Sequence, residues 1–449
     1  MVDSRRIKIE DMFDRLWPLP RSIAGQGFSD SLDIMAEMIP LKRLQYPTGT
    51  KVLDWHLPKI WEVRSAYFIG PNGKKYADFH KNNLHLVSYS VPFKGKMTLD
   101  ELKPHLYTLP SLPKAIPYAT SFFEERWGFC LNHEEYESLP EGEYEVVVDS
   151  VFKDGFFESG ECVLPGESKD EILFSSYLCH PSMASNELSG PLVLAFLYEK
   201  IAAMKQRKYT YRFVLNAETV GTIAYLSKRG QELKQKVKAG YVLTCLGDQA
   251  PFNYKRSRQG NSLADQAALS VLKELDPSRQ QYFVHDFDPS RGSEERQYCS
   301  PGYDLPVGSL MRSMYNDYKE YHSSLDNKDF ISFDAMLANV DLYSKIVAAL
   351  ESNQIWVNLN PYGEPQLGRR NLYPNLNVRS HDVRRARATM WLLNLADGQH
   401  DLFQISERSQ YPILLLADIA QTLKKEGLLV EASAKKQEAG SAKNLTVKS

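Results

Sequence analysis

The sequence contains 449 residues, of which 43% are hydrophobic and 24% are charged, and its formal net charge is -2. The length predicts more than one domain, and the composition is typical of a soluble globular protein. The balanced charge gives no electrostatic reason to expect a nucleic-acid partner.

The first residues and the cysteines predict a cytoplasmic protein. The opening MVDSRRIKIEDMFDRLW has charges where a signal peptide needs an apolar run, and no later stretch approaches the roughly 18 apolar residues of a membrane span. The odd number of cysteines, their wide spacing and the lack of a C-x-x-C pair favour reduced thiols. These cysteines are Cys130, Cys162, Cys179, Cys245 and Cys299.

Two helical segments are predicted between Arg6 and Met38, where WPLPRSIAGQG separates them with two prolines and two glycines. The next residues, 41–147, contain short runs of alternating polar and apolar residues between Pro, Gly and Asn turns. This pattern predicts a small β-rich domain that is inserted into the chain of a larger one.

From residue 148 the pattern changes to strands that alternate with helices, and EILFSSYL, YTYRFVLN, AGYVLTCL and YDLPVGSLM each precede a helical stretch. This alternation predicts the α/β class, with a mixed, largely parallel sheet and helices on both faces, built from residues 1–40 and 148–357. Residues 358–431 contain three short amphipathic helices, as in a winged-helix domain. We expect residues 432–449 to be a disordered tail.

A polar residue follows each of the four predicted strands. His180, Glu218 and Asp248 come soon after the first three, and His322 lies beyond the fourth. The carboxyl ends of parallel strands meet at one edge of a sheet, where α/β proteins bind ligands. Two imidazoles and two carboxylates at one place suit zinc. Each residue alone also fits a plainer role, as a surface histidine or a helix-capping carboxylate, and only the joint pattern favours a site.

Five ordered motifs resemble the bacterial aminopeptidase-like domain proteins, which are relatives of the zinc aminopeptidases and share their fold with the glutaminyl cyclases. The motifs are CHPSMASNELSGP, LNAETVGTIAYLS, GDQAPFNYKRSRQGNSLAD, GSEERQYCSPGYDLPVGSLMR and EYHSSLDNKDFIS. The resemblance extends from RSIAGQGF near the N-terminus to the winged-helix-like end, and therefore over nearly the whole chain. It implies the zinc aminopeptidase fold and a site for one or two zinc ions.

The resemblance also implies a role for each polar residue. In zinc aminopeptidases of this fold two zinc ions share a bridging Asp, so His180 and Asp248 would hold one ion and His322 would help to hold the other. Glu218 stands where those enzymes have a pair of glutamates, but its neighbour here is Thr219. A single glutamate serves either as a ligand or as the general base, and we favour the base.

The bridging position departs from the pattern of the related proteins. They usually read Asn-Asp-Asn before Leu-Ser-Gly, whereas this chain has Ser185, Asn186 and Glu187. Asn186 would then be the metal ligand in place of the bridging Asp, and an amide offers one carbonyl oxygen and no charge. Two dications about 3.5–4 Å apart depend on anionic ligands between them, so we expect weakened dinuclear loading. Glu187 is an alternative ligand, although a shift of one residue directs its side chain elsewhere.

The resemblance implies a hydrolase that cleaves an amide bond, in a small peptide or in an aminoacyl or acyl amide of a metabolite or sugar. Glu218 would accept a proton from water and pass it to the leaving amine. The inserted domain would form a lid that restricts substrate size and excludes water. The GSEERQY motif implies substrate-binding residues, with a surface salt-bridge cluster as the alternative. The candidates are Glu294, Glu295, Arg296 and Tyr298.

Two other functions stay open at the level of sequence. The loss of the bridging carboxylate at Asn186 also fits a catalytically silent relative that binds a small molecule or a protein. A DNA-binding regulator is disfavoured, because the candidate recognition segment YPILLLADIAQTLKKEGLL carries only Lys424 and Lys425 as basic residues. We expect a small-molecule or short-peptide substrate, no membrane partner, and either a homo-oligomer or a protein partner bound through the C-terminal domain.

Overall fold

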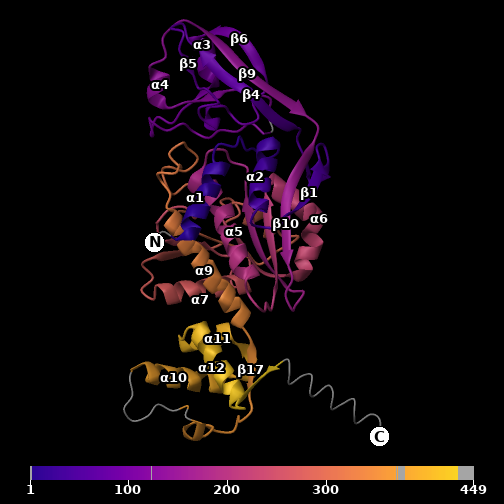
Figure 1. Ribbon diagram of the computed structural model, residues 1–449, viewed down its shortest axis with the longest axis vertical. Coiled ribbons are helices and arrows are strands. Elements are labelled where there is room, and N and C mark those ends of the chain that lie inside the picture. Colours follow the sequence, from indigo (N-terminus) through magenta and orange to yellow (C-terminus); the bar gives the residue numbers. More distant parts are fainter. Residues whose placement is uncertain (1–2, 123, 371, 373–379, 433–449) are drawn as a thin grey trace. The chain divides into compact units, whose positions relative to one another are not determined.

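The computed structural model describes residues 3–432 apart from 123, 371 and 373–379 (Figure 1). The chain forms two compact units. One comprises Met1–Ala264 and Gln280–Asp341, and the other comprises Asp265–Arg279 and Leu342–Ser449. The predicted tail lies, from residue 433, outside the described residues.

The first unit contains an eight-stranded mixed sheet with the order β1-β10-β12-β11-β13-β16-β14-β15. The four central strands are parallel to one another, whereas β1, β10 and β14 are antiparallel to their inner neighbours. The predicted mixed, largely parallel sheet is therefore confirmed. Its strands are β1 (Lys42–Pro47), β10 (Phe156–Leu164), β11 (Glu171–Tyr177), β12 (Thr210–Asn216), β13 (Val237–Val242), β14 (Phe252–Lys255), β15 (Tyr282–His285) and β16 (Val307–Met311).

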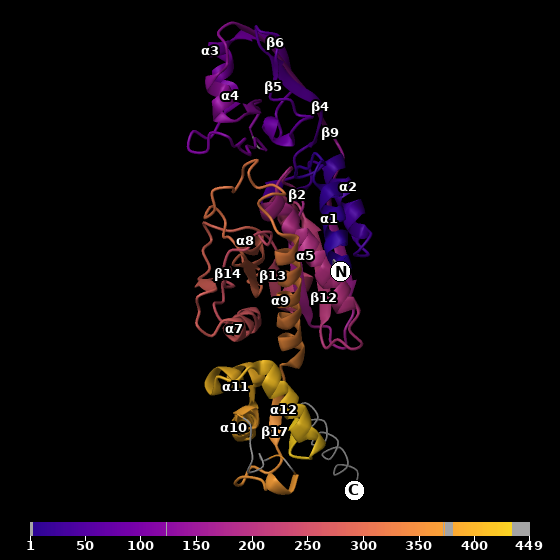
Figure 2. The ribbon, with the colours of Figure 1, turned by 60° about the vertical axis from the view of Figure 1, so that its left-hand side comes forward.

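Every residue of β11 and of β12 is buried, so both faces of the central sheet are covered. Such continuous burial is typical of parallel strands between helical layers, and it explains why EILFSSY and TYRFVLN do not alternate polar with apolar residues. Helix α5 packs on β11 and β12, and α6 packs on β10 and β12 (Figures 1 and 2). The helices are α1 (Ser4–Leu16), α2 (Gln26–Ala36), α5 (Ser189–Ala202), α6 (Val220–Lys236) and α8 (Glu295–Tyr298), with α7 (Leu263–Leu275) and α9 (Phe333–Ser352) continuing into the second unit.

The inserted domain is β-rich, as its sequence pattern predicts. Its main sheet has the antiparallel order β5-β4-β9-β6, and two small pairs, β2-β3 and β7-β8, accompany it. Because Lys42–Pro47 pairs with β10 in the large sheet, the inserted sheet begins later than the predicted boundary at residue 41. Its elements are β2 (Lys51–Val52), β3 (Trp55–His56), β4 (Ile60–Ile69), β5 (Lys75–Tyr76), β6 (Phe93–Thr98), α3 (Leu99–Leu102), β7 (Leu106–Tyr107), β8 (Phe129–Cys130), α4 (His133–Glu137) and β9 (Glu143–Lys153).

The C-terminal residues form three helices and a three-stranded sheet with the order β18-β17-β19. The three helices correspond to the three amphipathic stretches of the sequence. A capping box fixes the start of α11, because Asp401 accepts the N–H of Gln404 and the Gln404 side chain accepts the N–H of Asp401. The elements are β17 (Ile355–Asn358), α10 (Ser380–Leu395), β18 (Asp397–Asp401), α11 (Leu402–Ser409), α12 (Ile413–Lys425) and β19 (Leu429–Glu431).

Two absences apply to the described part of the chain. None of its helices is both long and apolar enough to cross a lipid bilayer. The five cysteines are buried and unpaired, as the sequence predicts.

Candidate metal site

Three polar residues, His180, Glu218 and His322, come together at the carboxyl ends of the central strands. Strands β12, β11, β13 and β16 are neighbours in the sheet and parallel, so the segments after them start from the same edge. The imidazole rings of His180 and His322 lie 5.2 Å apart between centroids. Nε2 of His180 lies 3.7 Å from Oε2 of Glu218. The structure therefore brings together residues that are up to 142 positions apart, His180 to His322.

Glu187 orients His180. Its Oε2 lies 2.8 Å from Nδ1 of the ring, and its Oε1 accepts the backbone N–H of His180 at 3.0 Å. The carbonyl oxygen of His180 accepts a hydrogen bond from Nη2 of Arg21 at 3.0 Å. Burial lowers the pKa of Arg21 to about 10, so its guanidinium stays positively charged at neutral pH and balances the negative charge of Glu187. With Nδ1 engaged, Nε2 is the nitrogen that His180 can offer to a ligand.

Cys179 lies beside the ring of His180. Its Sγ is 3.4 Å from Nδ1 of His180, and the ligand atoms of Cys179, His180 and Glu187 lie within 4.8 Å of one another. Burial raises the pKa of the Cys179 thiol to about 11, so the protonated form dominates. Its sulfur also accepts the backbone N–H of Glu218 at 3.2 Å. This thiol links two strand-end segments and is poorly suited to act as a nucleophile.

Asn186 lies on a buried turn of π-helix, Ala184–Leu188, that leads into α5. The carboxylate of Asp326 accepts the backbone N–H groups of Ser185 at 2.6 Å and of Asn186 at 2.9 Å. The backbone carbonyl oxygen of Asn186 accepts a hydrogen bond from the Thr244 hydroxyl at 2.9 Å. Among the described residues, the Oδ1 atom of Asn186 is buried and has no hydrogen-bond partner. Short π-helical segments are frequent at functional sites.

Asp248 lies beside this turn. Its Oδ2 accepts a hydrogen bond from the Ser185 hydroxyl at 3.2 Å, and its Oδ1 accepts the N–H of Ala250 at 2.9 Å. Its Oδ2 also accepts the N–H of Ser313 at 3.4 Å, and since a carboxylate has about four acceptor positions, one remains for a cation. Within the described chain, no hydrogen bond joins it to either histidine of the site.

His322, like Asn186, has a buried side-chain atom without a hydrogen-bond partner among the described residues. Its Nε2 is buried and without a hydrogen-bond partner in the described part of the chain. Burial, together with the nearby His180, lowers the pKa of His322 to about 3, so its ring is neutral at physiological pH. A neutral imidazole is the form that binds a metal ion. The ring also stacks on Tyr321, with centroids 3.9 Å apart.

Glu218 is placed for proton transfer. Its Oε1 accepts a hydrogen bond from the Ser293 hydroxyl at 2.5 Å, and its side chain is 24% exposed. A carboxylate that is fixed on one side and open to water on the other has the geometry of a general base. Ser293 comes from the GSEERQY motif, which thus contributes to the site through its serine.

Three of the four predicted substrate-binding residues are buried in internal networks. Glu294 accepts hydrogen bonds from Ser175 at 2.5 Å and from Thr222, Glu295 pairs with the buried Lys255 at 2.9 Å, and the Tyr298 hydroxyl lies 2.9 Å from the Ser175 hydroxyl. These contacts support the strand-end segments. Arg296 is partly exposed, and in the described chain its guanidinium makes one long hydrogen bond, to the carbonyl of Ser293 at 3.4 Å.

Each of the four strand-end segments contains a non-glycine residue with a positive φ angle, and the segment after β16 contains a second one, Asn316. Their φ angles are 48° at Ser182, 58° at Thr219, 51° at Cys245 and 52° at His322. Such residues cost roughly 1–3 kcal/mol each and gather at functional sites, because the fold must hold them there. Backbone strain and side-chain chemistry are separate observations, and both indicate a functional site at the carboxyl ends of the central strands.

Residues 10–353 match the family model "Domain of unknown function (DUF4910)", and residues 354–431 match the model "winged helix-turn-helix". The chain belongs to the DUF4910 family. A relative from Clostridium acetobutylicum, a "putative polysaccharide biosynthesis protein with aminopeptidase-like domain", is 41% identical over 402 residues, which are 90% of this chain and 91% of the relative. A solved structure of a "putative peptidase" from the same organism is 38% identical, covers 95% of this chain and 96% of its own, and has a TM-score of 0.88.

More distant structures show which fold the DUF4910 domain shares. The Bacillus subtilis zinc aminopeptidase has a TM-score of 0.55 at 12% identity and covers 76% of this chain and 93% of its own. A peptidase M28 precursor from Shewanella amazonensis has a TM-score of 0.54 at 12% identity, over 77% and 92%. The resemblance seen in the sequence is confirmed: the protein is aminopeptidase-like, with a zinc aminopeptidase fold and a C-terminal winged helix.

The residue types in the strand-end segments of this DUF4910 protein are ones that bind zinc, and among the described residues the ligand atoms within 4.8 Å of one another are those of Cys179, His180 and Glu187. Imidazole nitrogens and a carboxylate oxygen are typical zinc ligands, and two candidate donor atoms, on Asn186 and His322, are buried without partners. Sequence reasoning missed four supporting residues: Arg21, Asp326, Ser293 and the orienting role of Glu187. All four stand in quoted motifs, namely RSIAGQGF, EYHSSLDNKDFIS, GSEERQY and CHPSMASNELSGP, but a motif does not show which of its residues touch the site.

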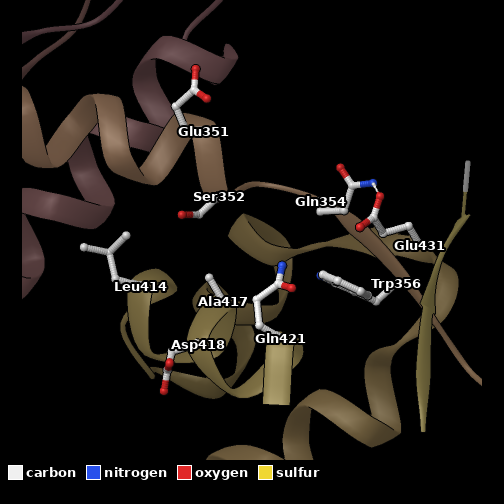
Figure 3. Close-up of a pocket in the computed structure, with 9 residues that line it drawn as sticks. All are labelled: Glu351, Ser352, Gln354, Trp356, Leu414, Ala417, Asp418, Gln421 and Glu431. Atoms are coloured by element: carbon white, nitrogen blue, oxygen red, sulfur yellow. Dashed lines mark hydrogen bonds between the residues drawn. The ribbon is translucent and has the colours of Figure 1, made fainter. Parts of the chain in front are cut away.

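The C-terminal unit has a cavity of its own, about 420 Å³ in volume, beside α12 and β17 (Figure 3). Figure 3 shows Trp356 and Gln421 on one side of it and Glu351 on another. Its lining contains three carboxylates and no basic side chain, which does not suit the phosphates of a nucleic acid. The lining residues are Glu351, Ser352, Gln354, Trp356, Leu414, Ala417, Asp418, Gln421 and Glu431.

Proposed function

We propose that the protein is a zinc-dependent hydrolase of the aminopeptidase type that cleaves an amide bond carried by a sugar or a small peptide. The observation that carries the proposal is the pair of buried, unpartnered donor atoms, Oδ1 of Asn186 and Nε2 of His322, in segments next to His180 and Asp248. Of the ten buried side-chain atoms without a partner among the described residues, these are the two that lie in the segments after the strand ends and belong to candidate ligands. The name of the Clostridium relative favours a sugar-linked amide over a free peptide.

The residues would divide the work as follows. His180, Asn186, Asp248 and His322 would hold the zinc ion, which when bound supplies Lewis-acid polarisation of a carbonyl and a more acidic water. Glu218 would accept a proton on Oε2 and deliver it to the leaving amine, while Ser293 holds Oε1. The partly exposed Glu218 side chain leaves that proton a route to the substrate.

A second function has one specific observation in its favour. Both carboxylate oxygens of Glu187 contact His180, so Glu187 does not supply the negative charge that the Asn186 amide lacks. A site with less negative charge holds two dications poorly, and a protein that binds its ligand without cutting would result. Metal content and turnover decide between the two functions.

Metal content is the first test. The purified protein should contain zinc by elemental mass spectrometry, and a His180→Ala, His322→Ala double variant should lose it. His85→Ala is the matched control, because His85 is a buried histidine whose Nδ1 lies 2.8 Å from the carbonyl oxygen of Cys130, outside the site. Equal zinc in the double variant and in the control would refute the site.

Turnover is the second test. We expect hydrolysis of N-acylated amino sugars or aminoacyl anilides to require zinc and to be lost in Glu218→Gln, which keeps the shape of the side chain and its contact with Ser293. Zinc binding without turnover on any such amide would favour the binding protein. Loss of zinc in Glu218→Gln would make Glu218 a ligand rather than the base.

Location and partners belong to the same proposal. Unpaired thiols persist in reducing compartments, so we place the protein in the cytoplasm. We assign the winged-helix domain to protein contacts, either with a second copy or with another protein, because its cavity is acidic. Retention on heparin at low salt would contradict this assignment.

A further inference from the structure

A segment of the inserted domain pairs with the backbone that carries His322. The N–H of Tyr118 donates to the carbonyl oxygen of His322 at 2.9 Å, and the N–H of Ser324 donates to the carbonyl oxygen of Ile116 at 2.8 Å. The hydroxyl of Ser324 accepts the N–H of Ile116 at 3.0 Å. An antiparallel bridge joins the middle residues of the two segments. The inserted domain therefore adds a short strand to the loop of the candidate site.

The ring of Tyr118 reaches both histidines. Its centroid lies 5.0 Å from that of His180 and 5.3 Å from that of His322, and its plane is perpendicular to the His322 ring. The edge-to-face contact with His322 favours one orientation of that ring. His322 thus contacts two tyrosines, Tyr321 from its own loop and Tyr118 from the inserted domain.

The contact acts on a strained residue. His322 has a φ of 52°, a conformation that survives only where its surroundings hold it. The hydrogen bond from Tyr118 falls on the carbonyl of this same residue. Without the inserted segment, one of the restraints on the His322 backbone and one on its ring would be lost together.

A second anchor ties the inserted domain to His180. The hydroxyl of Ser88 lies 3.0 Å from that of Ser22. The preceding residue, Arg21, donates to the carbonyl oxygen of His180. The inserted domain is thus connected to the backbones of both histidines, through different segments.

We propose that Tyr118 is a positioning residue of the candidate metal site, which fixes the strained His322 backbone and holds the rings of His180 and His322 in the orientation of metal ligands. The inserted domain is then a structural part of the site rather than only a lid over it. The effect of Tyr118 on zinc affinity rests on the proposed function. Its effect on the orientation of the His322 ring does not, because that can be measured without metal.

Two variants of Tyr118 separate the ring from the hydroxyl. Tyr118→Phe keeps the ring and Tyr118→Ala removes it, while both variants keep the backbone N–H that donates to His322. Tyr67→Ala is the matched control, because Tyr67 is a partly buried tyrosine in the main sheet of the inserted domain. Zinc affinity, measured by competition with a chromogenic chelator, should fall about tenfold to a hundredfold in Tyr118→Ala, the range seen when residues that orient metal ligands are removed. Tyr118→Phe and Tyr67→Ala should keep the affinity of the unmodified protein.

The second readout uses metal-free protein labelled with ¹³C at histidine Cε1, with signals assigned through His180→Ala and His322→Ala. We expect one sharp signal for His322 in the unmodified protein and in Tyr118→Phe, and a broadened or split signal in Tyr118→Ala. Unchanged affinity and a sharp His322 signal in Tyr118→Ala would overturn the proposal, as would equal losses in Tyr118→Phe. If the unmodified protein binds no zinc, the proposed function fails, and the His322 signal alone decides this inference.

Discussion

The Asn186→Asp variant should convert this site from one that holds a single metal ion to one that holds two. The change restores a carboxylate at the bridging position with almost no change of shape. It acts where Oδ1 is buried and, among the described residues, has no hydrogen-bond partner. Zinc content should rise from about one to about two per chain, because the bridging anion offsets the repulsion between two dications.

Without metal, the same variant should be less stable. A fully buried carboxyl has its pKa raised by roughly three units or more, and each unit corresponds to about 1.4 kcal/mol, so folding loses up to about 4 kcal/mol at pH 7. The sign follows from linkage, because the pKa of this carboxyl is higher in the folded state than in the unfolded state. The variant therefore loses no folding free energy below about pH 4, and it loses the most above the raised pKa. The loss should therefore shrink as the pH is lowered towards 4.

The assay is thermal unfolding in chelator and in excess zinc. Asn216→Asp is the matched control, since Asn216 is also fully buried, ends the neighbouring strand β12 and has an unpartnered Oδ1 among the described residues. Both variants should unfold earlier in chelator, but only Asn186→Asp should recover in zinc, because a ligand that binds only the folded state stabilises it. The same zinc response in both variants, without a rise in zinc content, would refute the assignment of Asn186.

Two further predictions concern stability. Burial raises the pKa of Glu294 to about 8, so folding should weaken as the pH rises from about 4.5 towards 8, and Glu294→Gln should remove this slope in urea unfolding; an unchanged slope would contradict it. Arg212→Met should cost about 3 kcal/mol, because it removes the buried cation that Glu161 and Glu171 share and leaves them only Arg229 and the more distant Lys236. Arg64→Met, which breaks an exposed pair with Asp149, should cost well under 1 kcal/mol, and similar urea midpoints would contradict the difference.

The sheet and its functional edge could be predicted because they depend on patterns that lie within short windows. EILFSSYL and YTYRFVLN are apolar enough to be buried strands, and parallel strands place whatever follows them at one edge. His180, Glu218 and His322 could be found by that rule alone. The strand Lys42–Pro47 could not, because six residues with two charges read equally well as part of the inserted domain.

The supporting residues could not be predicted, since their roles depend on pairings across the chain. Asp326 holds the turn of Asn186 from 140 residues away, and Tyr118 reaches His322 from another domain. Glu294 looked like a group for substrates because charged residues rarely lie inside a protein. Its burial depends on the hydroxyls of Ser175 and Thr222, which no local pattern connects to it.

Asn186 and Glu187 stand where the resemblance leads us to expect Asp and Asn, and the contacts of Glu187 suggest a physical reason for this difference. A carboxylate at 186 would lie between two metal ions, whereas Glu187 lies behind His180 and binds its Nδ1. A carboxylate in that place fixes the ring and makes Nε2 a better donor to one ion. On the proposed assignment, the negative charge of this turn lies behind one ligand, His180, and not at position 186. It follows that this chain should hold one zinc ion at the His180 side, and that Asn186→Asp should add a second without displacing the first.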